Sequence, residues 1–470
     1  MRARHATWLL SSMVVTGIAC EHVDDAREER ATSPTAVPTS VTSPSPLDAS
    51  ADTGEAGVTA PSRLARLEAL VAALRAEPDA AKRDTLVDAF VTTTEGDGGF
   101  PILEAGKLAI VHVDRERRGG TFAVAGDHNG WSVTASPLER VVSGSDVYVR
   151  VEPFSPTTAR SRYKIVRGGA EYFADPLARR FAFDTFGEHS LAVAGSAESH
   201  RQRLRDVRDR TGRLPARTVE IHVPAVYEAA PGEGLPVLVM QDGQNLFASK
   251  GAGSWNVDVA VDAAISRAEV RPFLVVAVPH GPDRFAEYTH TTDSLPGIGA
   301  VGGLADAYAA YVVDDVLPAV RRQLRTREGA ESTAIGGSSL GGLVSLYVAR
   351  ARPDVFGAAL SFSGTMSWGT LGRTNPTIEA LYRARAPRGL TIYLDSGGSD
   401  GGGCATLTPL VSEERFDQYC ESRAMRDALV TLGWTLGSDL HYAWERDALH
   451  DEAAWARRFP SAIRAVFPRR

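Results

Sequence analysis

The stretch AIGGSSLGGLVSLYVARARPD, residues 334–354, decides the fold of the C-terminal part of the chain. An apolar strand pattern runs into two glycines and two serines, and a helical apolar stripe follows. Gly337 to Gly341 match G-x-S-x-G, in which small residues let a strand and a helix approach closely around a strained serine. That serine is Ser339, and Ser338 lies one residue early. The pattern predicts a turn that presents Ser339 as a nucleophile; an ordinary glycine-rich turn is the alternative.

A second G-x-S-x-G match at 397–401, centred on Ser399, shows that the motif alone is not specific in a chain with 44 glycines. It follows the apolar run LTIYLD but continues into GGCATLTPL, which has no helical stripe. A serine there does not meet a helix N-terminus, where backbone amides favour negative charge. The context therefore favours Ser339.

Apolar runs alternate with helical patterns from Arg217 onward. The runs include TVEIHVP, LPVLVMQD, FLVVAVPH and AALSFSG, and DAYAAYVVDDVLPAVRRQL at 306–324 is one of the helical patterns between them. Such alternation predicts the α/β class, with a mostly parallel sheet covered on both faces. We expect residues 217–470 to form one catalytic domain.

A nucleophilic serine needs a base, usually histidine, and a carboxylate that orients it. In this kind of site the partners follow the serine in the order acid, then histidine. After Ser339 the chain contains only two histidines, His441 and His450. His441 lies inside the strand-like DLHYAWE, whereas His450 follows it on a loop before a helix. We therefore predict His450 as the base.

The acid is expected just after the strand TIYL. Asp395 lies at the end of that strand, and Asp400 lies further along a glycine-rich loop that can curl toward the histidine. We predict Asp400 as the acid, with Asp395 as the alternative. The two amides of an oxyanion hole are predicted at Leu340, directly after the nucleophile, and at Gln244 in the loop DGQNLF.

The first 20 residues have the pattern of an export signal. Arginines precede a short apolar run, and small residues lead to Cys20 in TGIAC. This ending resembles a bacterial lipobox, in which the cysteine is lipidated, although Gly17 stands where a larger aliphatic residue is usual. We expect an exported protein, either periplasmic or anchored to the membrane through Cys20. Plain secretion is the main alternative.

The rest of the N-terminal half divides by composition. Residues 21–61 are rich in Ser, Thr and Pro and predict a disordered tether. Leucines at helical spacing predict a short helical segment at 62–96. Short alternating strands at 97–198 predict a β-sandwich. The charged residues 199–216 predict a linker to the catalytic domain.

Cysteine count and charge limit the ligands. Export would expose Cys404 and Cys420 to an oxidising compartment, so a disulfide is expected, with two free buried thiols as the alternative. Two cysteines make a poor metal site, and no metal or organic cofactor is expected. A net charge of −7 gives no broad basic surface, so nucleic acid is not an expected partner.

Three N-terminal segments resemble the Ig-like carbohydrate-binding module of glycogen-branching enzymes, and enterochelin esterases carry a related domain. They are FAVAGDHNGWS, SRYKIVRGGAEYFADPLARR and GEHSLAV. The resemblance implies an all-β Ig-like sandwich before the catalytic domain. Trp131 and Tyr163 are expected in its core or turns, and a sugar-stacking surface is the alternative.

Six segments of the C-terminal part resemble the esterase-D-like family of α/β-hydrolases. They are VLVMQDGQNLF, VAVPHGPDRFAEYT, AIGGSSLGG, SFSG, IYLDSGGSD and LHDEAAWARRFP. The resemblance implies an α/β-hydrolase fold with Ser339 as nucleophile, Asp400 as acid and His450 as base. It also implies a substrate pocket near the family's R-x-x-E-Y segment, with a structural ion pair as the equal alternative. The pocket residues are Asp242, Gly243, Arg284, Glu287 and Trp368, with Tyr288 beside them.

The predicted function is that of a serine carboxylic-ester hydrolase working through an acyl-enzyme. The two-part layout looks most like enterochelin esterase, whose anionic iron complex would need basic residues such as Arg284, Arg373 or Arg383. A feruloyl or acetyl-xylan esterase and an acyltransferase are the alternatives. A binding lipoprotein on a hydrolase scaffold is a further one. The expected partner is a small-molecule ester.

Overall fold

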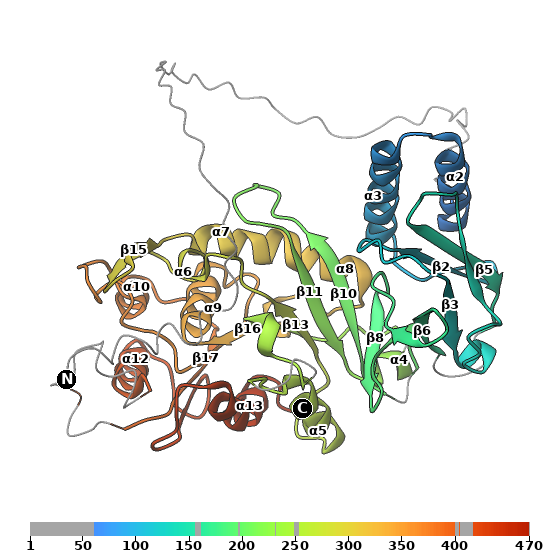
Figure 1. Cartoon of the computed structure of the whole chain (residues 1–470). Coiled ribbons are helices and arrows are strands. Elements are labelled where there is room, and N and C mark those ends of the chain that lie inside the picture. Colours follow the sequence, from blue (N-terminus) through green and yellow to red (C-terminus); the bar gives the residue numbers. More distant parts are fainter. Residues whose placement is uncertain are drawn as a thin grey trace, which may run out of the picture. The chain divides into compact units, whose positions relative to one another are not determined.

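The structure, a computed structural model, describes part of the chain (Figure 1). The described residues are 61–155, 161–195, 198–230, 232–248, 253–399, 404 and 417–469. The export signal, Cys20 and almost all of the tether lie outside these residues and stay predictions. None of the helices in the described part combines the length and apolar character that a bilayer span requires. The same part holds no cluster of three or more His, Cys, Asp or Glu side chains placed to bind a metal ion.

A mixed sheet forms the frame of the C-terminal part. β10 pairs antiparallel with β11, β11 pairs antiparallel with β13, and the order β13-β12-β16-β17-β18-β19 is parallel. The parallel strands all end at one edge, so the loops that follow them gather there. The strands are β10 (His200–Val207), β11 (Arg217–Val223), β12 (Val237–Gln241), β13 (Leu274–Val278), β16 (Thr333–Ser338), β17 (Ala358–Phe362), β18 (Thr391–Ser396) and β19 (Leu440–Trp444).

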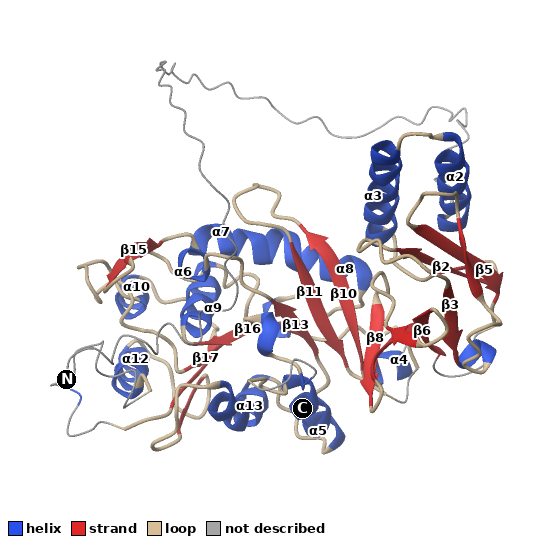
Figure 2. Cartoon of the chain, in the orientation of Figure 1, coloured by secondary structure: helices blue, strands red, loops and turns tan. Residues whose placement is uncertain are grey.

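Helices cover both faces of this sheet, which explains the uninterrupted apolar runs of its strands (Figure 2). In β12, Val237 and Val239 face one core, and Leu238 and Met240 face the other. The first core is closed by α7 (Ala305–Ala310), the π-helical segment Tyr311–Val316, α8 (Leu317–Gln323), α9 (Leu340–Ala351), α10 (Ile378–Ala384) and α12 (Tyr419–Thr431). The second core is closed by α5 (Val257–Ser266) and α13 (Glu452–Val466). The arrangement is α/β-hydrolase-like, as expected.

The connections carry short elements. They are α4 (Val226–Ala229), the single turn η2 (Gly243–Asn245), α6 (Arg284–Glu287), the turn Ala330–Ser332 and the hairpin of β14 (Thr292–Leu295) with β15 (Gly299–Gly302). η2 follows β12 almost directly, and the hairpin follows β13 after the connection that contains α6. They therefore lie among the segments that can border a site at the carboxyl edge.

The N-terminal strands form two antiparallel layers that share a core. One layer contains β1 (Ile102–Glu104), β2 (Lys107–Val113), β4 (Pro137–Arg140) and β5 (Val147–Pro153). The other contains β3 (Phe122–Gly126), β6 (Ser161–Arg167), β7 (Glu171–Phe173), β8 (Arg180–Asp184) and β9 (Gly187–Val193). Leu108 and Ile110 of the first layer pack with Phe122 and Ile165 of the second. Tyr163 is fully buried in this core and donates to Asp175 at 2.7 Å.

Two helices cover the outer side of the first layer. They are α2 (Arg63–Ala76) and α3 (Ala80–Gly96), which stand side by side in Figure 1. Leu67, Leu70 and Leu74 of α2 pack with Ile102 and Val111 of the strands. Ser62 caps α2 by accepting the amide of Ala65 at 3.2 Å. The helical segment expected at 62–96 is therefore an integral layer of the N-terminal part.

The stretch 199–216, expected to be a linker, contains β10. This strand looked like a linker because it is rich in arginine, but its arginines are paired. Arg201 forms a buried ion pair with Asp258, and Arg203 binds both carboxylate oxygens of Glu188 at 2.7 Å. β10 also pairs with β8, so the second N-terminal layer continues into the catalytic sheet.

A buried histidine gives the N-terminal part a pH-dependent stability. His112 on β2 is 2% exposed and packs against Phe122 at a ring-centroid distance of 4.5 Å. Burial lowers the pKa of His112 to about 4; the charge of Arg118 adds to this and that of Asp114 opposes it. In the unfolded chain the pKa is about 6.5, so as the pH falls below that value the unfolded state binds a proton that the folded state does not.

We therefore expect acid to destabilise the wild type more than His112→Phe. Each pKa unit corresponds to about 1.4 kcal/mol, so the wild type should lose roughly 2 kcal/mol of unfolding free energy through this residue between about pH 7 and about pH 5. Urea unfolding at both pH values measures the loss. An equal loss in the variant would show that His112 is not its source.

Candidate active site

Ser339 stands on a strained turn between β16 and α9. Its backbone angles are φ 53° and ψ −122°, a conformation that residues other than glycine rarely adopt. The Ser339 amide donates to the Phe362 carbonyl at 2.9 Å, and the Thr365 amide donates to the Ser339 carbonyl at 3.2 Å. These bonds hold the turn in place. Ser338 is the last residue of β16 and is buried, so Ser339 is the serine that the turn presents.

The two glycines of the motif allow the close approach of β16, α9 and β12. A Cβ atom on Gly337 would lie 2.8 Å from Cβ of Gln241. A Cβ atom on Gly341 would lie 3.0 Å from Oδ2 of Asp242. The loop after β12 therefore lies against the first turn of α9. This is where an oxyanion hole would need it.

That loop contains the predicted oxyanion residue Gln244. Asp242 adopts a left-handed conformation with φ 56°, and η2 places Gln244 on its exposed side. Gly243 fits because a Cβ atom there would meet the backbone of Ala277 at 2.7 Å. The second predicted donor, Leu340, is the first residue of α9, whose N-terminal amides favour a developing negative charge.

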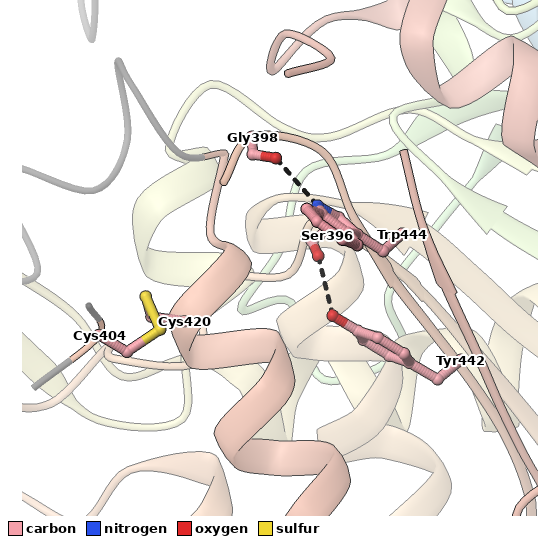
Figure 3. The surroundings of a disulfide bond; sticks show 6 residues. All are labelled: Ser396, Gly398, Cys404, Cys420, Tyr442 and Trp444. Carbon is pink, nitrogen blue, oxygen red and sulfur yellow. Dashed lines mark hydrogen bonds between the residues drawn. A yellow bond between two sulfur atoms is a disulfide. The ribbon is translucent and has the colours of Figure 1, made fainter. Parts of the chain in front are cut away.

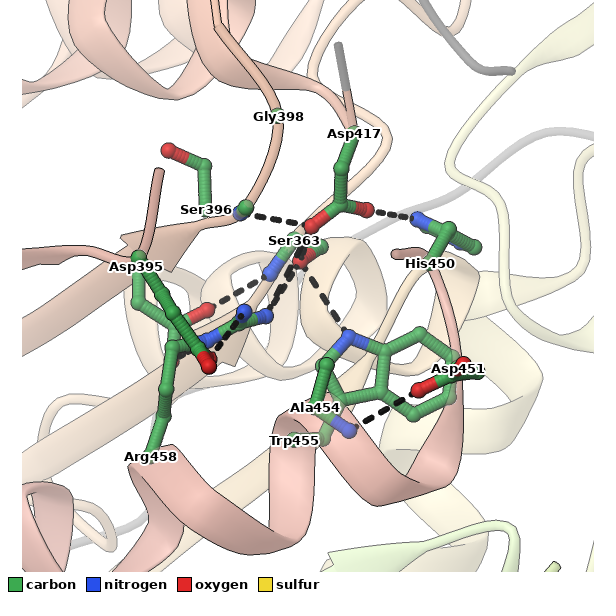
Figure 4. Close-up of polar contacts among 12 residues, drawn as sticks. Ser363, Asp395, Ser396, Gly398, Asp417, His450, Asp451, Ala454, Trp455 and Arg458 are labelled. Atoms are coloured by element: carbon green, nitrogen blue, oxygen red, sulfur yellow. Dashed lines mark hydrogen bonds and ion pairs between the residues drawn. The ribbon is translucent and has the colours of Figure 1, made fainter. Parts of the chain in front are cut away.

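His450 lies on the loop between β19 and α13, as expected of the base (Figure 4). Its Nδ1 donates to Oδ1 of Asp417, and its ring meets Trp455 edge-to-face at 5.0 Å. Two residues further on, Glu452 accepts the side-chain amide of Asn245 at 3.0 Å. The histidine loop thus meets the loop after β12. His441 instead donates to the Ser438 carbonyl at 3.1 Å within its own strand region.

The carboxylate that His450 contacts is Asp417, which the sequence reasoning did not consider. Asp417 is 2% exposed and accepts the Gly397 amide at 2.6 Å and the Ser363 hydroxyl at 2.7 Å (Figure 4). Its chemistry is that of a triad acid, because it fixes the tautomer and orientation of the histidine. The predicted acid Asp400 lies outside the described residues, so its own position stays open.

Asp395, the alternative acid, binds residues other than the histidine in its described contacts. It is fully buried, accepts the Ser363 amide at 3.1 Å and pairs with Nε of Arg458 at 3.1 Å (Figure 4). Burial raises its pKa to about 6, against the lowering effect of Arg458. These contacts are with Ser363 and Arg458, whereas the carboxylate that His450 contacts is that of Asp417. Asp395 therefore lies behind the Asp417–His450 pair.

The predicted pocket residues fall into two groups. Arg284 forms a two-point ion pair with Asp242, with both N–O distances at 2.8 Å, beside the Ser339 turn. Glu287 is instead buried in an ion pair with Arg217 at 3.0 and 3.1 Å. This is the structural alternative that the sequence left open for the R-x-x-E-Y segment.

Tyr288 and Trp368 are also buried. Tyr288 accepts the Asp242 amide at 3.1 Å, and burial raises its pKa well above the ordinary value. Trp368 is 1% exposed, stacks on Phe285 at 5.9 Å and donates to the Thr291 carbonyl at 2.8 Å. Tyr288 thus holds the Asp242 turn, and Trp368 packs on α6 through Phe285.

A disulfide joins Cys404 to Cys420 (Figure 3). Cys420 lies at the start of α12, three residues after Asp417. On the other side of the same loop, Trp444 donates to the Gly398 carbonyl at 2.9 Å (Figure 3). The disulfide thus lies close to Asp417 in the chain, and Gly398, next to the Gly397 amide that binds Asp417, is tied to β19.

Removing this disulfide is expected to destabilise the protein and to weaken catalysis together. A cross-link closing a loop of this length is worth roughly 3 kcal/mol in the chain-entropy model. Cys404→Ser with Cys420→Ser should therefore lower the midpoint of thermal unfolding by several degrees and also lower kcat, because Asp417 loses a covalent cross-link three residues away in the chain. Calorimetry and ester hydrolysis measure the two effects. An unchanged midpoint would show that the bond does not stabilise the fold.

A comparison with protein families identifies the family of the chain. The model of the family described as "Putative esterase" matches residues 215–466, more than half of the chain. The chain belongs to this esterase family. Membership places it among carboxylic ester hydrolases, the enzyme class expected from the sequence. The matched range also contains Ser339, Asp417 and His450.

Among its relatives, this esterase-family chain is 28% identical over 254 residues to the iron(III) salmochelin esterase of Escherichia coli O6:H1, covering 50% of this chain and 53% of that protein. It is 26% identical over 168 residues to an endo-1,4-beta-xylanase/feruloyl esterase of Xylanibacter ruminicola, covering 34% and 20%. The chain thus spans about half of the first relative and less of the second. A ferric enterobactin esterase structure from Salmonella typhimurium matches with a TM-score of 0.42 and 17% identity, covering 81% of this chain and 98% of that one.

Proposed function

We propose that the protein is a serine carboxylic-ester hydrolase with Ser339, His450 and Asp417 as its triad. One observation carries this proposal. The strained Ser339 turn lies at the carboxyl edge of the sheet, and the loop with His450, which contacts Asp417, follows β19 at the same edge. Family membership supports the reaction class. Asp400, the acid expected from the sequence, stays a competing proposal.

The chemistry proceeds in two halves. Because Nδ1 of His450 is bonded to Asp417, Nε2 is the nitrogen that takes the Ser339 proton as Oγ attacks the ester carbonyl. The amides of Leu340 and Gln244 bind the oxyanion. The tetrahedral intermediate collapses to the acyl-enzyme, and His450 returns the proton to the departing alcohol. Water then attacks the acyl carbonyl with the same proton relay and releases the acid.

The charges near Ser339 favour an uncharged ester over an anionic iron complex. Of the three arginines considered for such a complex, Arg284 is paired with Asp242 and Arg383 with Glu379, and Arg373 is exposed. Two of these three arginines are therefore already balanced by a carboxylate. The second candidate, a carbohydrate ester of the feruloyl or acetyl type, is therefore our preferred substrate class over a siderophore ester.

A substrate panel tests the proposal. We expect hydrolysis of p-nitrophenyl acetate, a higher kcat/KM for methyl ferulate or acetylated xylan, and little cleavage of ferric enterobactin. Efficient cleavage of ferric enterobactin would reverse the substrate preference. Failure on every ester would favour the binding lipoprotein. Ester products formed with an added sugar alcohol would identify an acyltransferase.

The remaining sequence predictions stay proposals. We propose that the two N-terminal layers form an Ig-like sandwich and that Cys20 is lipidated after export. The disulfide supports an oxidising compartment. Trp131 donates to Asp127 at 3.0 Å in a turn, in keeping with the turn role rather than a sugar-stacking surface. Mass spectrometry of the membrane fraction tests the lipidation.

A further inference from the structure

A buried charge cluster lies behind the Asp417–His450 pair (Figure 4). Asp395 at the end of β18, Asp417 before α12 and Arg458 on α13 are 0%, 2% and 5% exposed. Arg458 lies 3.1 Å from Oδ2 of Asp395 and 3.6 Å from Oδ2 of Asp417. One guanidinium thus faces two carboxylates that are almost completely removed from water. Asp417 is the carboxylate that accepts from Nδ1 of His450.

We propose that Asp395 and Arg458 are positioning residues, which form a nearly neutral pair that fixes Asp417 and keeps it ionised against His450. The proposal rests on the proposed hydrolase function, since it concerns the acid of that triad. In this proposal the charge of Arg458 balances the two carboxylates, and the charge of Asp395 limits how strongly Arg458 acts on Asp417. Neither residue touches the substrate.

The physical argument is one of charge balance. Two buried carboxylates without a cation cannot both stay ionised, and one takes up a proton. Burial raises the pKa of Asp395, and Arg458 acts against that rise. The same guanidinium lies 3.6 Å from Asp417 and so balances part of the charge of both carboxylates. Without it, either one aspartate takes up a proton, or both stay ionised and the extra negative charge makes His450 hold its own proton more tightly. Both effects remove the active form at mildly acidic pH.

Ser363 links the members of the cluster through hydrogen bonds. Its hydroxyl donates to Asp417 at 2.7 Å and accepts from Arg458 at 2.8 Å and from the Trp455 indole at 3.2 Å. Its backbone has φ 45°, in the left-handed region. Since its amide also binds Asp395, Ser363 connects both carboxylates to one rigid point. A shift of Arg458 would therefore move Asp417 as well as change its charge environment.

The other groups around the cluster do not replace Arg458. The Tyr393 hydroxyl donates to Asp395 at 3.2 Å, and burial raises the pKa of Tyr393 well above the ordinary value, so it stays neutral. Glu445, after β19, lies 3.3 Å from Nη1 of Arg458 but is one-third exposed, so its charge is partly screened. Gly397 contributes an amide to Asp417. Apart from the histidine, Arg458 is the cation that these contacts bring to Asp417.

The test is a double-mutant cycle read as pH profiles of kcat/KM for p-nitrophenyl acetate. Arg458→Met should move the acid limb up by about one pH unit, a roughly tenfold loss of kcat/KM on that limb. Asp395→Asn should move it down, because Arg458 then faces Asp417 alone. The double variant should return close to the wild-type profile. A merely structural role predicts losses that add, with no return.

Arg457→Met is the matched control, since this neighbour on α13 pairs with Glu445 while 56% exposed; its profile should not move. A double variant that shifts as far as Arg458→Met overturns the proposal. If Arg458→Met fails to fold, an upward or absent shift in Asp395→Asn overturns it too. Absence of fluorophosphonate labelling at Ser339 in the folded wild type would contradict the hydrolase proposal instead. The two failures are therefore distinguishable.

Discussion

Alanine in place of Ser339 is expected to lower kcat/KM for p-nitrophenyl acetate by about 10⁴-fold or more, with the fold intact. In the proposed mechanism this hydroxyl carries the acyl chain, so its loss removes the covalent route. We expect the residual hydrolysis to come from direct attack of water on the ester, with the oxyanion amides stabilising the charge on the carbonyl oxygen. The Ser339 hydroxyl makes a long hydrogen bond of 3.4 Å to Thr365, so we expect its removal to cost little stability.

Two matched serines test the assignment. Ser338→Ala changes the adjacent residue, which is buried at the end of β16, and Ser399→Ala changes the centre of the second G-x-S-x-G match. Both variants should keep fluorophosphonate labelling, and Ser339→Ala should lose it. Labelling that survives in Ser339→Ala but disappears in either control would assign the nucleophile elsewhere.

Asparagine in place of Asp417 is expected to lower kcat by about 10³- to 10⁴-fold. An amide at this position can still accept or donate a hydrogen bond, but it cannot stabilise the imidazolium that forms when His450 takes the Ser339 proton. It also allows the wrong tautomer. Because binding of the ester is not affected directly, KM should change little.

Asp400→Asn is the comparison that decides between the two acids. If Asp417 is the acid, Asp400→Asn should stay within about threefold of the wild type. The opposite pattern, with Asp400→Asn inactive and Asp417→Asn nearly normal, would restore the acid predicted from the sequence. Circular dichroism of both variants shows whether the helices and sheet persist.

The sequence predicted the α/β-hydrolase-like arrangement and the surroundings of Ser339 because these depend on neighbours in the chain. The glycines at 337 and 341, the strand before them and the stripe after them are local signals. The position of His450 followed from the order of the strands. In each case a short stretch of residues is enough to explain the local structure that it forms.

Asp417 could not be found in this way. It lies 21 residues beyond the last residue of β18, in FDQYC, and its role depends on a loop that returns to the sheet edge. The one signal in the sequence was Cys420 three residues later, since a disulfide that holds the loop also holds the aspartate. β10 was missed for a related reason: its arginines meet partners such as Asp258, far away in the chain.

The pairing of β8 with β10 has a consequence for motion. Arg203 donates its amide to the Arg179 carbonyl at 2.8 Å, and the Arg205 side chain binds the carbonyls of Leu177 and Ala178. A hinge between two halves needs a connection that can turn with few bonds broken. Here β8 of the N-terminal layers and β10 of the catalytic sheet are joined by ladder hydrogen bonds. A rotation of one half against the other would break these bonds. Access to Ser339 must therefore be governed by the loops at its own edge, while the N-terminal layers serve it as a fixed extension of the same scaffold.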